Sequence, residues 1–435
     1  MIRIWKLKDG AGRELASRLK ERGRKEDPRV EAAVAGIIEG VRRRGDAAVR
    51  DDTLKFDGAL PEKTELSPED MRRSAAECGR DFLDALGRAA ENIRRFHERQ
   101  KQQSWFVTRP DGVMMGQRIR GLSRVGIYVP GGTAAYPSSV LMNAIPAKIA
   151  GVGEIVMATP PAAGGRPNPA IMAAALRAGV DRVFQIGGAQ AVAALAFGTE
   201  TVPAVDKIVG PGNIYVATAK KQLFGTVGID MVAGPSEILI LADGTANPRF
   251  LAADLMSQAE HDPLASAILL TPSEEIASAT VREIDRQIGG LSRKEIIEKS
   301  LDRYGAVVVC GTMDEAVDFA NEIAPEHLEV CAENPMEFLG RIDNAGSVFL
   351  GNYAPEPLGD YYAGPNHVLP TGGTARFSSP LSVDAFVKKS SFLYYTKEAL
   401  GRADADIVAL ARAEGLTAHA NSIEVRRPAG KEPEK

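Results

Sequence analysis

The sequence predicts a doubly wound α/β protein that contains two parallel sheets. Short, continuous apolar runs recur between residues 125 and 350 and alternate with segments of helical pattern. Such runs are typical of parallel strands that helices cover on both faces. Glycine-rich turns follow several of the runs, and a length of 435 residues suggests two to three domains at about 150 residues each. The expected strands are residues 125–129, 155–158, 183–186, 207–209, 238–241, 267–270, 306–309 and 347–350.

We therefore expect two incomplete Rossmann-like sheet domains, a helical N-terminal region and a small C-terminal helical tail. Residues 121–235 form one α/β domain. We expect residues 236–380 to form the other α/β domain, and we assign residues 27–120 to the same domain. Residues 1–26 are expected to form an N-terminal helical arm, and residues 381–435 the tail.

The residues before about 104 have the pattern of helices. Asp27 followed by Pro28 is an N-cap with proline at the first helical position, and Ser67 followed by Pro68 opens a second, long helix. His97 lies in a charged run of that helix, so we interpret it as a solvated residue.

An alternating pattern at residues 105–120, interrupted at residues 110–112 by Pro-Asp-Gly, predicts a β-hairpin. In the tail, residues 391–395 resemble a strand, and residues 397–414 resemble a helix that ends at Gly415. A tail this short has little core of its own. It must therefore dock on its own subunit or on a partner.

The composition is that of an ordinary globular protein, with 44% hydrophobic residues, 25% charged residues and a net charge of −4. This argues against a disordered chain, a collagen-like chain or a polybasic nucleic-acid binder. Cys78, Cys310 and Cys331 are too few and too scattered for a disulfide framework or a thiolate zinc site. No signal peptide or membrane-spanning run is evident, so we expect a cytoplasmic protein.

Glycines gather where the expected strands of the 121–235 domain end, at residues 130–132, 187–190 and 210–213. Glycine lets the backbone approach a phosphate, and the N-terminus of the following helix favours its negative charge. Ordinary turn chemistry is the alternative. The G-x-G-x-x-G fingerprint is absent from its proper place, so a dinucleotide would have to bind in a variant mode.

Two short polar motifs have the residue types of a catalytic site. Gln258 and His261 are three positions apart on an expected helix and therefore share one face of it. They can offer an oxygen and a nitrogen to one metal ion. Glu326 and His327 follow a proline before an expected strand. Adjacent Glu and His suit general acid–base catalysis, although a surface turn is the structural alternative.

The C-terminal third adds further candidates. The loop at residues 359–367 is polar, aromatic and long for a mere connector. His419 follows the tail helix, and Glu414 lies at the end of that helix, where a carboxylate is disfavoured unless a cation is near. Together these segments supply two nitrogens and two oxygens without a thiolate, which argues against a structural zinc site and resembles non-haem iron centres. The pooled ligands are Gln258, His261, Asp360 and His419.

From about residue 25 to residue 425 the chain resembles histidinol dehydrogenase. The motifs that carry the resemblance are GIYVPGG (126–132), GGAQAVAALAFGT (187–199), VDKIVGPGN (205–213), AGPSE (233–237), DLMSQAEHD (254–262), APEHLE (324–329), GSVFLGNY (346–353), NHVLPT (366–371) and LTAH (416–419). They follow the order of that family.

The resemblance implies the final steps of histidine biosynthesis, the four-electron oxidation of L-histidinol through L-histidinaldehyde to L-histidine by two NAD⁺. It implies one zinc ion per subunit, held by Gln258, His261, Asp360 and His419, that orients the substrate rather than activating water. It implies that His327 takes the alcohol proton and that Glu326 activates the water that adds to the aldehyde. The implied substrate contacts are Ser236, Gln258, His261, His327, Asp360, His367, Glu414 and His419, and the implied NAD contacts are Tyr128, Gln190 and Asn213.

The resemblance also implies a homodimer in which the tail, with Glu414 and His419, completes the partner's site. The 121–235 domain then binds NAD, and the other α/β domain is catalytic. No nucleic-acid or membrane partner is implied. The nearest alternative is a same-fold zinc and NAD dehydrogenase of another small polyol. A metal-dependent hydrolase, an iron oxygenase and a non-enzymatic metal-binding protein are further alternatives.

Overall fold

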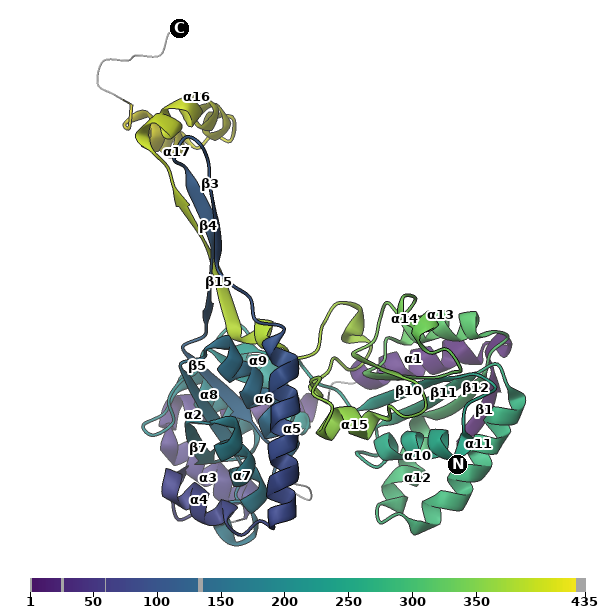
Figure 1. The fold of residues 1–435 in the computed structure, drawn as a ribbon. Helices are drawn as coiled ribbons and strands as arrows, with labels where there is room; N and C mark the ends of the chain where they lie inside the picture. Colours follow the sequence, from purple (N-terminus) through teal and green to yellow (C-terminus); the bar gives the residue numbers. More distant parts are fainter. Residues whose placement is uncertain (1, 25–26, 59, 132–135, 428–435) are drawn as a thin grey trace. The chain divides into compact units, whose positions relative to one another are not determined.

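The computed structural model describes residues 2–24, 27–58, 60–131 and 136–427. The chain divides into two compact units, of which the first comprises residues 1–101 and 121–386 and the second residues 102–120 and 387–435. The first unit contains two six-stranded sheets, called here sheet A and sheet B, and the second unit a three-stranded sheet (Figure 1). The expected α/β class is confirmed.

Sheet B has the strand order β2-β7-β6-β5-β8-β9, and all its neighbouring strands are parallel except β2 and β7. Successive residues of a strand point to opposite faces. Val125 and Ile127 of β5 accordingly pack into one core, whereas Tyr128 packs into another. The strands are β2 (Glu65–Leu66), β5 (Arg124–Tyr128), β6 (Glu154–Thr159), β7 (Arg182–Gln185), β8 (Lys207–Val209) and β9 (Gly228–Ile229).

Helices cover both faces of sheet B. On one face lie α4 (Pro68–Ala75), α5 (Arg80–Glu98), α6 (Pro137–Ala150) and α7 (Pro169–Ala178). On the other lie α2 (Pro28–Arg44), α3 (Asp46–Asp57), α8 (Gly188–Phe197) and α9 (Ile214–Leu223). Asp27 and Ser67 cap α2 and α4 as expected, and Ser67 forms a capping box with Asp70. The single long helix expected after Ser67 is wrong, because residues 76–79 divide it into α4 and α5.

The structure corrects the assignment of residues 27–120 to the 236–380 domain. Val34 and Val41 of α2, and Leu86 and Ile93 of α5, are buried in the two cores of sheet B. Residues 102–120 belong to the second unit. An amphipathic pattern shows that one face of a helix is buried, but it does not show which sheet receives that face.

Sheet A has the order β1-β12-β11-β10-β13-β14, and all neighbouring strands are parallel. The expected N-terminal helical arm is partly wrong, because β1 (Arg3–Lys6) pairs with β12 as an edge strand. Helix α1 (Ala11–Arg24) then packs its Leu15 and Leu19 into the core on one face. The other strands are β10 (Glu237–Ala242), β11 (Ser266–Thr271), β12 (Gly305–Val309), β13 (His327–Cys331) and β14 (Ser347–Leu350).

The helices of sheet A also lie on both faces. Helices α10 (Pro248–Ala259), α11 (Glu274–Gln287) and α12 (Lys294–Tyr304) share one core, and α13 (Met313–Ile323) packs with α1 in the other. Two short helices follow, α14 (Met336–Leu339) and α15 (Glu356–Tyr361). Helix α10 ends just before His261, so His261 lies in the turn after the helix rather than on it.

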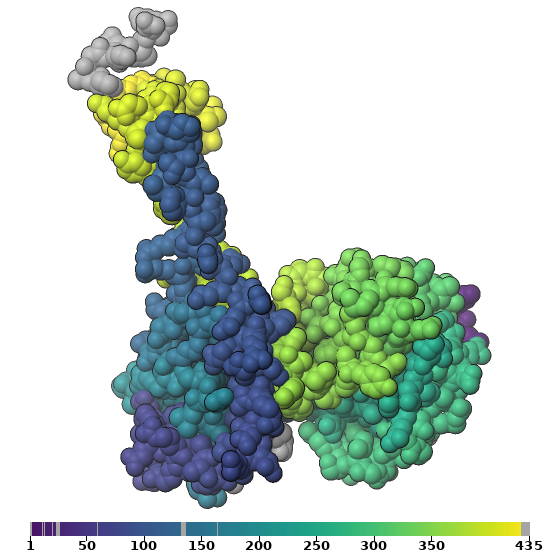
Figure 2. All heavy atoms as spheres, viewed as in Figure 1, coloured from purple at the N-terminus to yellow at the C-terminus, as the bar shows by residue number. Residues whose placement is uncertain are grey.

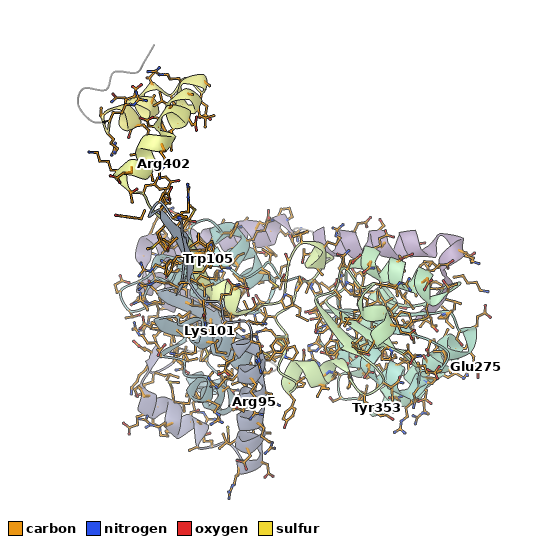
Figure 3. The ribbon with its side chains drawn as sticks, turned by 45° about the horizontal axis from the view of Figure 1, so that its top comes forward. Arg95, Lys101, Trp105, Glu275, Tyr353 and Arg402 are labelled. Carbon is orange, nitrogen blue, oxygen red and sulfur yellow. The ribbon has the colours of Figure 1, made fainter. Side chains whose placement is uncertain are left out.

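The second unit contains the expected hairpin and the expected tail from Val387 onward, whereas residues 381–386 belong to the first unit, with Leu381 and Phe386 buried in a core of sheet B. Strands β3 (Trp105–Thr108) and β4 (Met114–Gly121) are antiparallel, and β15 (Val387–Tyr394) is the third strand. Helices α16 (Lys397–Ala413) and α17 (Thr417–Glu424) pack on one another around Val408, Ala411 and Ala420. Arg402 of α16 donates to Asp111 of the hairpin turn at 3.0 Å (Figure 3).

Several large apolar side chains of the second unit, whose surface Figure 2 draws in blue and yellow, are exposed, among them Trp105, Tyr394 and Leu410. All four residues of β3 are exposed, with Phe106 62% exposed, and Leu393 of β15 is 69% exposed. In the described part of the chain, no helix combines the length and hydropathy that a membrane span needs.

Candidate active site

Glu326 and His327 lie at the start of β13, in the interior of sheet A, and both are buried. The preceding Ala324 has φ +53°, the one left-handed non-glycine residue in the described part of the chain. A left-handed alanine is disfavoured and persists where the surroundings require it. It ends α13 and turns the chain so that the Glu-His pair enters the sheet. The surface-turn alternative for this pair is therefore wrong.

The neighbouring strand β10 holds both side chains through the backbone of Glu237. The Glu237 N–H donates to Glu326 Oε2 at 2.8 Å, and the Glu237 carbonyl oxygen lies 3.0 Å from His327 Nδ1. A carbonyl can only accept, so Nδ1 carries the proton that is donated to it. In the neutral ring, Nε2 then presents its lone pair. Nε2 is buried and has no hydrogen-bond partner among the described residues.

Burial and neighbouring charge shift the pKa values of this pair. Burial raises the pKa of Glu326 to about 8. Burial disfavours a charged His327, but the carboxylates of Glu326 and Asp360 outweigh this and raise the imidazole pKa to about 10. His327 Nδ1 lies 3.6 Å from Glu326 Oε2, so the charges of the two groups are coupled, and among these carboxylates the imidazole keeps its proton at neutral pH.

A group of ligand atoms from three side chains lies beside His327. One atom each from His261, Glu356 and Asp360 lie within 4.8 Å of one another. The Gln258 Oε1 atom is buried without a partner among the described residues. Its Nε2 lies 3.3 Å from His327 Nδ1, a contact that is not a hydrogen bond while Nδ1 carries the proton donated to Glu237. Burial lowers the pKa of His261, so that its imidazole is neutral, as a metal ligand must be.

The structure thus brings Gln258, His261 and Asp360 into one site and adds Glu356, which the sequence reasoning missed. Glu356 and Asp360 are four positions apart on α15, so they share one face of the helix. That spacing was the available signal. It was obscured because α15 is only six residues long and has two prolines near its start, Pro355 and Pro357.

Further buried carboxyls surround Glu356. Glu329 Oε1 accepts the N–H of Glu356 at 2.7 Å, whereas Glu329 Oε2 is buried without a partner among the described residues. Burial raises the pKa of Glu356 to about 8 and that of Asp254 to about 6. A cation at this point would relieve the crowding of negative charge, so the donor set and the electrostatics both fit a metal ion.

His367 lies on a loop beside Asp360, and Ser236 immediately precedes β10. The Nδ1 of His367 is 3.0 Å from the Asp360 carbonyl oxygen, and its Nε2 is 3.2 Å from the Ser139 hydroxyl of α6. Ser236 is half-buried immediately before β10, and its carbonyl oxygen accepts the N–H of Ser266. Ser139 is a second residue that the sequence reasoning did not single out.

The expected NAD contacts all lie at the carboxyl edge of sheet B. The Tyr128 hydroxyl, at the end of β5, accepts the N–H of Gly188 at 3.1 Å, and burial raises its pKa to about 12. Gln190 of α8 is buried, and neither atom of its amide has a partner among the described residues. Asn213 caps α9. Residues 132–135, which include part of the first glycine loop, lie outside the described residues.

The third glycine loop is held by a buried ion pair. Asp230 Oδ2 accepts the Gly210 N–H at 2.8 Å, and Lys220 Nζ donates to the Gly210 carbonyl oxygen at 2.9 Å. Gly210 has φ +108°, and a Cβ here would lie 2.2 Å from the Tyr128 carbonyl oxygen. Only glycine can therefore occupy this position.

Glu414 and His419 belong to the second unit. Glu414 is the C-cap residue of α16, as expected, and His419 lies in the first turn of α17. Because the two units are described separately, the placement of these residues toward the site stays a prediction.

Three comparisons identify the relatives of the chain. The family model for histidinol dehydrogenase matches residues 20–427. A histidinol dehydrogenase of Clostridium acetobutylicum is 55% identical over 428 residues, covering 98% of this chain and 99% of the relative. One from Listeria monocytogenes is 56% identical over 422 residues, covering 97% and 99%. The crystal structure of histidinol dehydrogenase from Elizabethkingia anophelis superposes with a TM-score of 0.91 at 38% identity, covering 98% and 97%.

The fold, the buried Glu-His pair and these relatives define an NAD-dependent oxidoreductase. Within this class the chain belongs to the histidinol dehydrogenase family, whose name places it in histidine biosynthesis.

The cysteines offer no reactive thiolate for aldehyde oxidation. All three are free, and burial raises the pKa of Cys78 and Cys331 and raises that of Cys310 to about 11. We expect the variant Cys78→Ser/Cys310→Ala/Cys331→Ala to keep NADH formation from L-histidinol within about threefold of the parent, since no covalent thiol step is needed. A loss of roughly several-hundred-fold in kcat, with an unchanged circular dichroism spectrum, would contradict this.

Proposed function

We propose that this enzyme oxidises L-histidinol through L-histidinaldehyde to L-histidine, with two NAD⁺ consumed in turn and one zinc ion per subunit. The observation that carries the proposal is His327 Nε2, which is buried without a hydrogen bond to any described residue and lies 3.7 Å from Asp360 Oδ1, beside the ligand atoms of His261 and Asp360 and the buried Gln258 Oε1. The test is NADH formation from L-histidinol, with two NADH per L-histidine formed. A same-fold dehydrogenase of another polyol is the alternative, and small diols in the same assay distinguish it.

Gln258, His261 and Asp360 would hold the zinc ion, together with His419, and Glu356, whose carboxylate lies among the same ligand atoms, is a further candidate ligand. Imidazole nitrogen and carboxylate or amide oxygen suit zinc in an exchangeable site, whereas structural zinc sites use thiolates. When bound, zinc supplies positive charge that holds the imidazole and amine of the substrate and opposes protonation of the nearby His327. The orphaned Gln258 Oε1 atom supports this assignment.

Tyr128, Gln190 and Asn213 would line the NAD⁺ site. When bound, NAD⁺ accepts the hydride in each oxidation. The unpartnered amide of Gln190 offers a donor and an acceptor to a ligand, and the glycine turns before α8 and α9 let a dinucleotide approach the helix N-termini.

The chain's own residues supply the proton chemistry. His327 Nε2 receives the hydroxyl proton of the alcohol, while the Glu237 carbonyl oxygen keeps Nδ1 protonated and the ring oriented. Glu326, whose pKa burial raises to about 8, takes a proton from the water that adds to the aldehyde. As the water adds, His327 Nε2 gives the proton it received to the aldehyde oxygen, so the ring is neutral again when it deprotonates a hydroxyl group of the hydrate in the second oxidation. Burial of both side chains keeps bulk water away from these transfers.

Ser236, His367 and Glu414 would complete the substrate site, together with the metal ligands and His327. The Asp360 carbonyl oxygen holds His367 Nδ1, and Nε2, which the rotatable Ser139 hydroxyl contacts, is the ring atom that would be offered to the substrate.

We further propose a homodimer in which the second unit completes the partner's site through Glu414 and His419. The support is the exposed apolar surface of that unit, including Trp105, Phe106 and Leu393. Uncovered apolar surface of this extent marks a protein–protein interface. We place the enzyme in the cytoplasm, since its three cysteines are free, as in a reducing compartment.

The roles of the acid–base pair can be separated by isosteric variants. Glu326→Gln should lose about 10²–10⁴-fold in oxidation of L-histidinaldehyde, yet retain its reduction to L-histidinol by NADH, because that reaction needs no water. His327→Asn should lose both the oxidation and the reduction of L-histidinaldehyde, because Nε2 takes the proton from the hydroxyl group in one direction and returns it in the other. NADH absorbance measures both reactions. If Glu326→Gln lost the oxidation and the reduction of L-histidinaldehyde to the same extent, the role of Glu326 would not be confined to the addition of water.

Metal content tests the ligand group. Asp360→Asn and Glu356→Gln should each lower zinc per subunit below the expected value of about one, measured by elemental analysis after dialysis. The exposed Glu337→Gln on α14 is the matched control and should retain its zinc. Full zinc content in Asp360→Asn would refute the site, and full content in Glu356→Gln would leave Glu356 outside the ligand shell.

Mixed dimers test the contribution of the tail in trans. His419→Asn and Glu326→Gln, each with little activity alone, should recover roughly a quarter of the parent activity after unfolding and refolding together. Half of the randomly formed dimers are then mixed, and each mixed dimer has one intact site. A mixture as inactive as its components would show that His419 acts within its own subunit.

A further inference from the structure

His97 is fully buried, although the charged run around it predicted a solvated residue. It lies in the last turn of α5, and its neighbours Phe96 and Glu98 point in other directions because consecutive residues are about 100° apart on a helix. Burial lowers the pKa of His97 despite the nearby carbonyl oxygens of Ile93 and Leu381. The ring is therefore neutral.

A buried histidine needs partners for both ring nitrogens, and His97 has them. Nδ1 lies 2.9 Å from the Ile93 carbonyl oxygen, one turn earlier on α5, so Nδ1 carries the proton. Nε2 is then an acceptor, and the side-chain nitrogen of Asn366 lies 3.3 Å away.

Two further contacts determine the orientation of the Asn366 amide. Its nitrogen donates to the Met142 carbonyl oxygen of α6 at 2.6 Å, and its oxygen accepts the Val368 N–H at 2.9 Å. The nitrogen must therefore face His97 Nε2 as a donor. His97, Asn366 and Met142 thus form one fully satisfied buried network, which is a rigid arrangement.

The network includes the residues on both sides of His367 in the chain. Asn366 precedes His367, and Val368, whose N–H the Asn366 oxygen accepts, follows it. Val368 is itself buried in the core that α5 and α6 share with sheet B, and its carbonyl oxygen accepts the N–H of Leu381. The backbone of His367 is therefore held on either side, and its ring is directed at the Asp360 carbonyl oxygen and Ser139.

We propose that His97 is a positioning residue for substrate binding, which acts through Asn366 to place the imidazole of His367. This inference rests on the proposed function, in which His367 contacts L-histidinol. The chain of contacts runs from His97 Nε2 to the Asn366 amide, from the amide to the backbone on either side of His367, and from there to the substrate.

Two amide substitutions at residue 97 separate this role from stability alone. The amide of His97→Gln reaches the position of Nε2 and can accept from Asn366, whereas that of His97→Asn reaches only the position of Nδ1. The two variants are similar in polarity, and each keeps one of the two contacts. In His97→Asn we expect the KM for L-histidinol to rise about tenfold, with the KM for NAD⁺ within about twofold of the parent. In His97→Gln, the KM values for L-histidinol and for NAD⁺ should both stay within about threefold of the parent.

The second measurement is the KM for L-histidinol in an enzyme that already carries His367→Asn. Adding His97→Asn there should change the KM for L-histidinol by less than about twofold, because residues that act through one another are not additive. A further tenfold rise would overturn the proposal. Equal L-histidinol KM values for the Asn and Gln variants, with only the melting temperature lowered, would overturn it as well. If the parent enzyme itself formed no NADH from L-histidinol, the proposed function would fail instead, so the two failures are distinguishable.

Discussion

The buried pair of Glu326 and His327 depends on the backbone of one residue in the neighbouring strand. Glu237 donates its N–H to Glu326 and accepts from His327 Nδ1 with its carbonyl oxygen, so one residue orients both side chains. The parallel register of β10 and β13, in which Ile238 is opposite His327, produces this arrangement. The Glu237 side chain is buried against Arg22 of α1, an ion pair that anchors the start of β10. The N-terminal segment is thus part of the structure that supports the site.

Buried negative charge is the second constraint on this site. Asp254, Glu329, Glu356 and Asp360 are close together, and an uncompensated cluster of carboxylates is unfavourable away from water. Part of that charge is removed by protonation, as the raised pKa values of Glu356 and Glu329 indicate. Part is balanced by His327. A divalent cation held by His261 and Asp360 would balance more of it, which joins the electrostatics of the site to its proposed chemistry.

Local signals in the sequence predicted local structure well. The caps at Asp27 and Ser67, the hairpin turn at residues 110–112 and the end of α16 at Gly415 all depend on neighbours within a few residues. The assignment of α2 and α5 to the wrong sheet, and of residues 3–6 to a helix, arose where the outcome depended on distant residues. A strand at a sheet edge has only one partner, and β12, which pairs with β1, lies some three hundred residues later in the chain.

The sequence by itself determined the class of fold, the family motifs and the residue types that the chemistry requires, because these are properties of short segments. It could name Glu326, His327, Gln258, His261 and Asp360, but not how they are held. Only the tertiary structure decided that Glu237 orients Glu326 and His327, that Glu356 lies beside His261 and Asp360, and that His97 is buried against Asn366. Each of these contacts joins segments far apart in the chain, and their meeting depends on how helices and strands pack rather than on any local pattern.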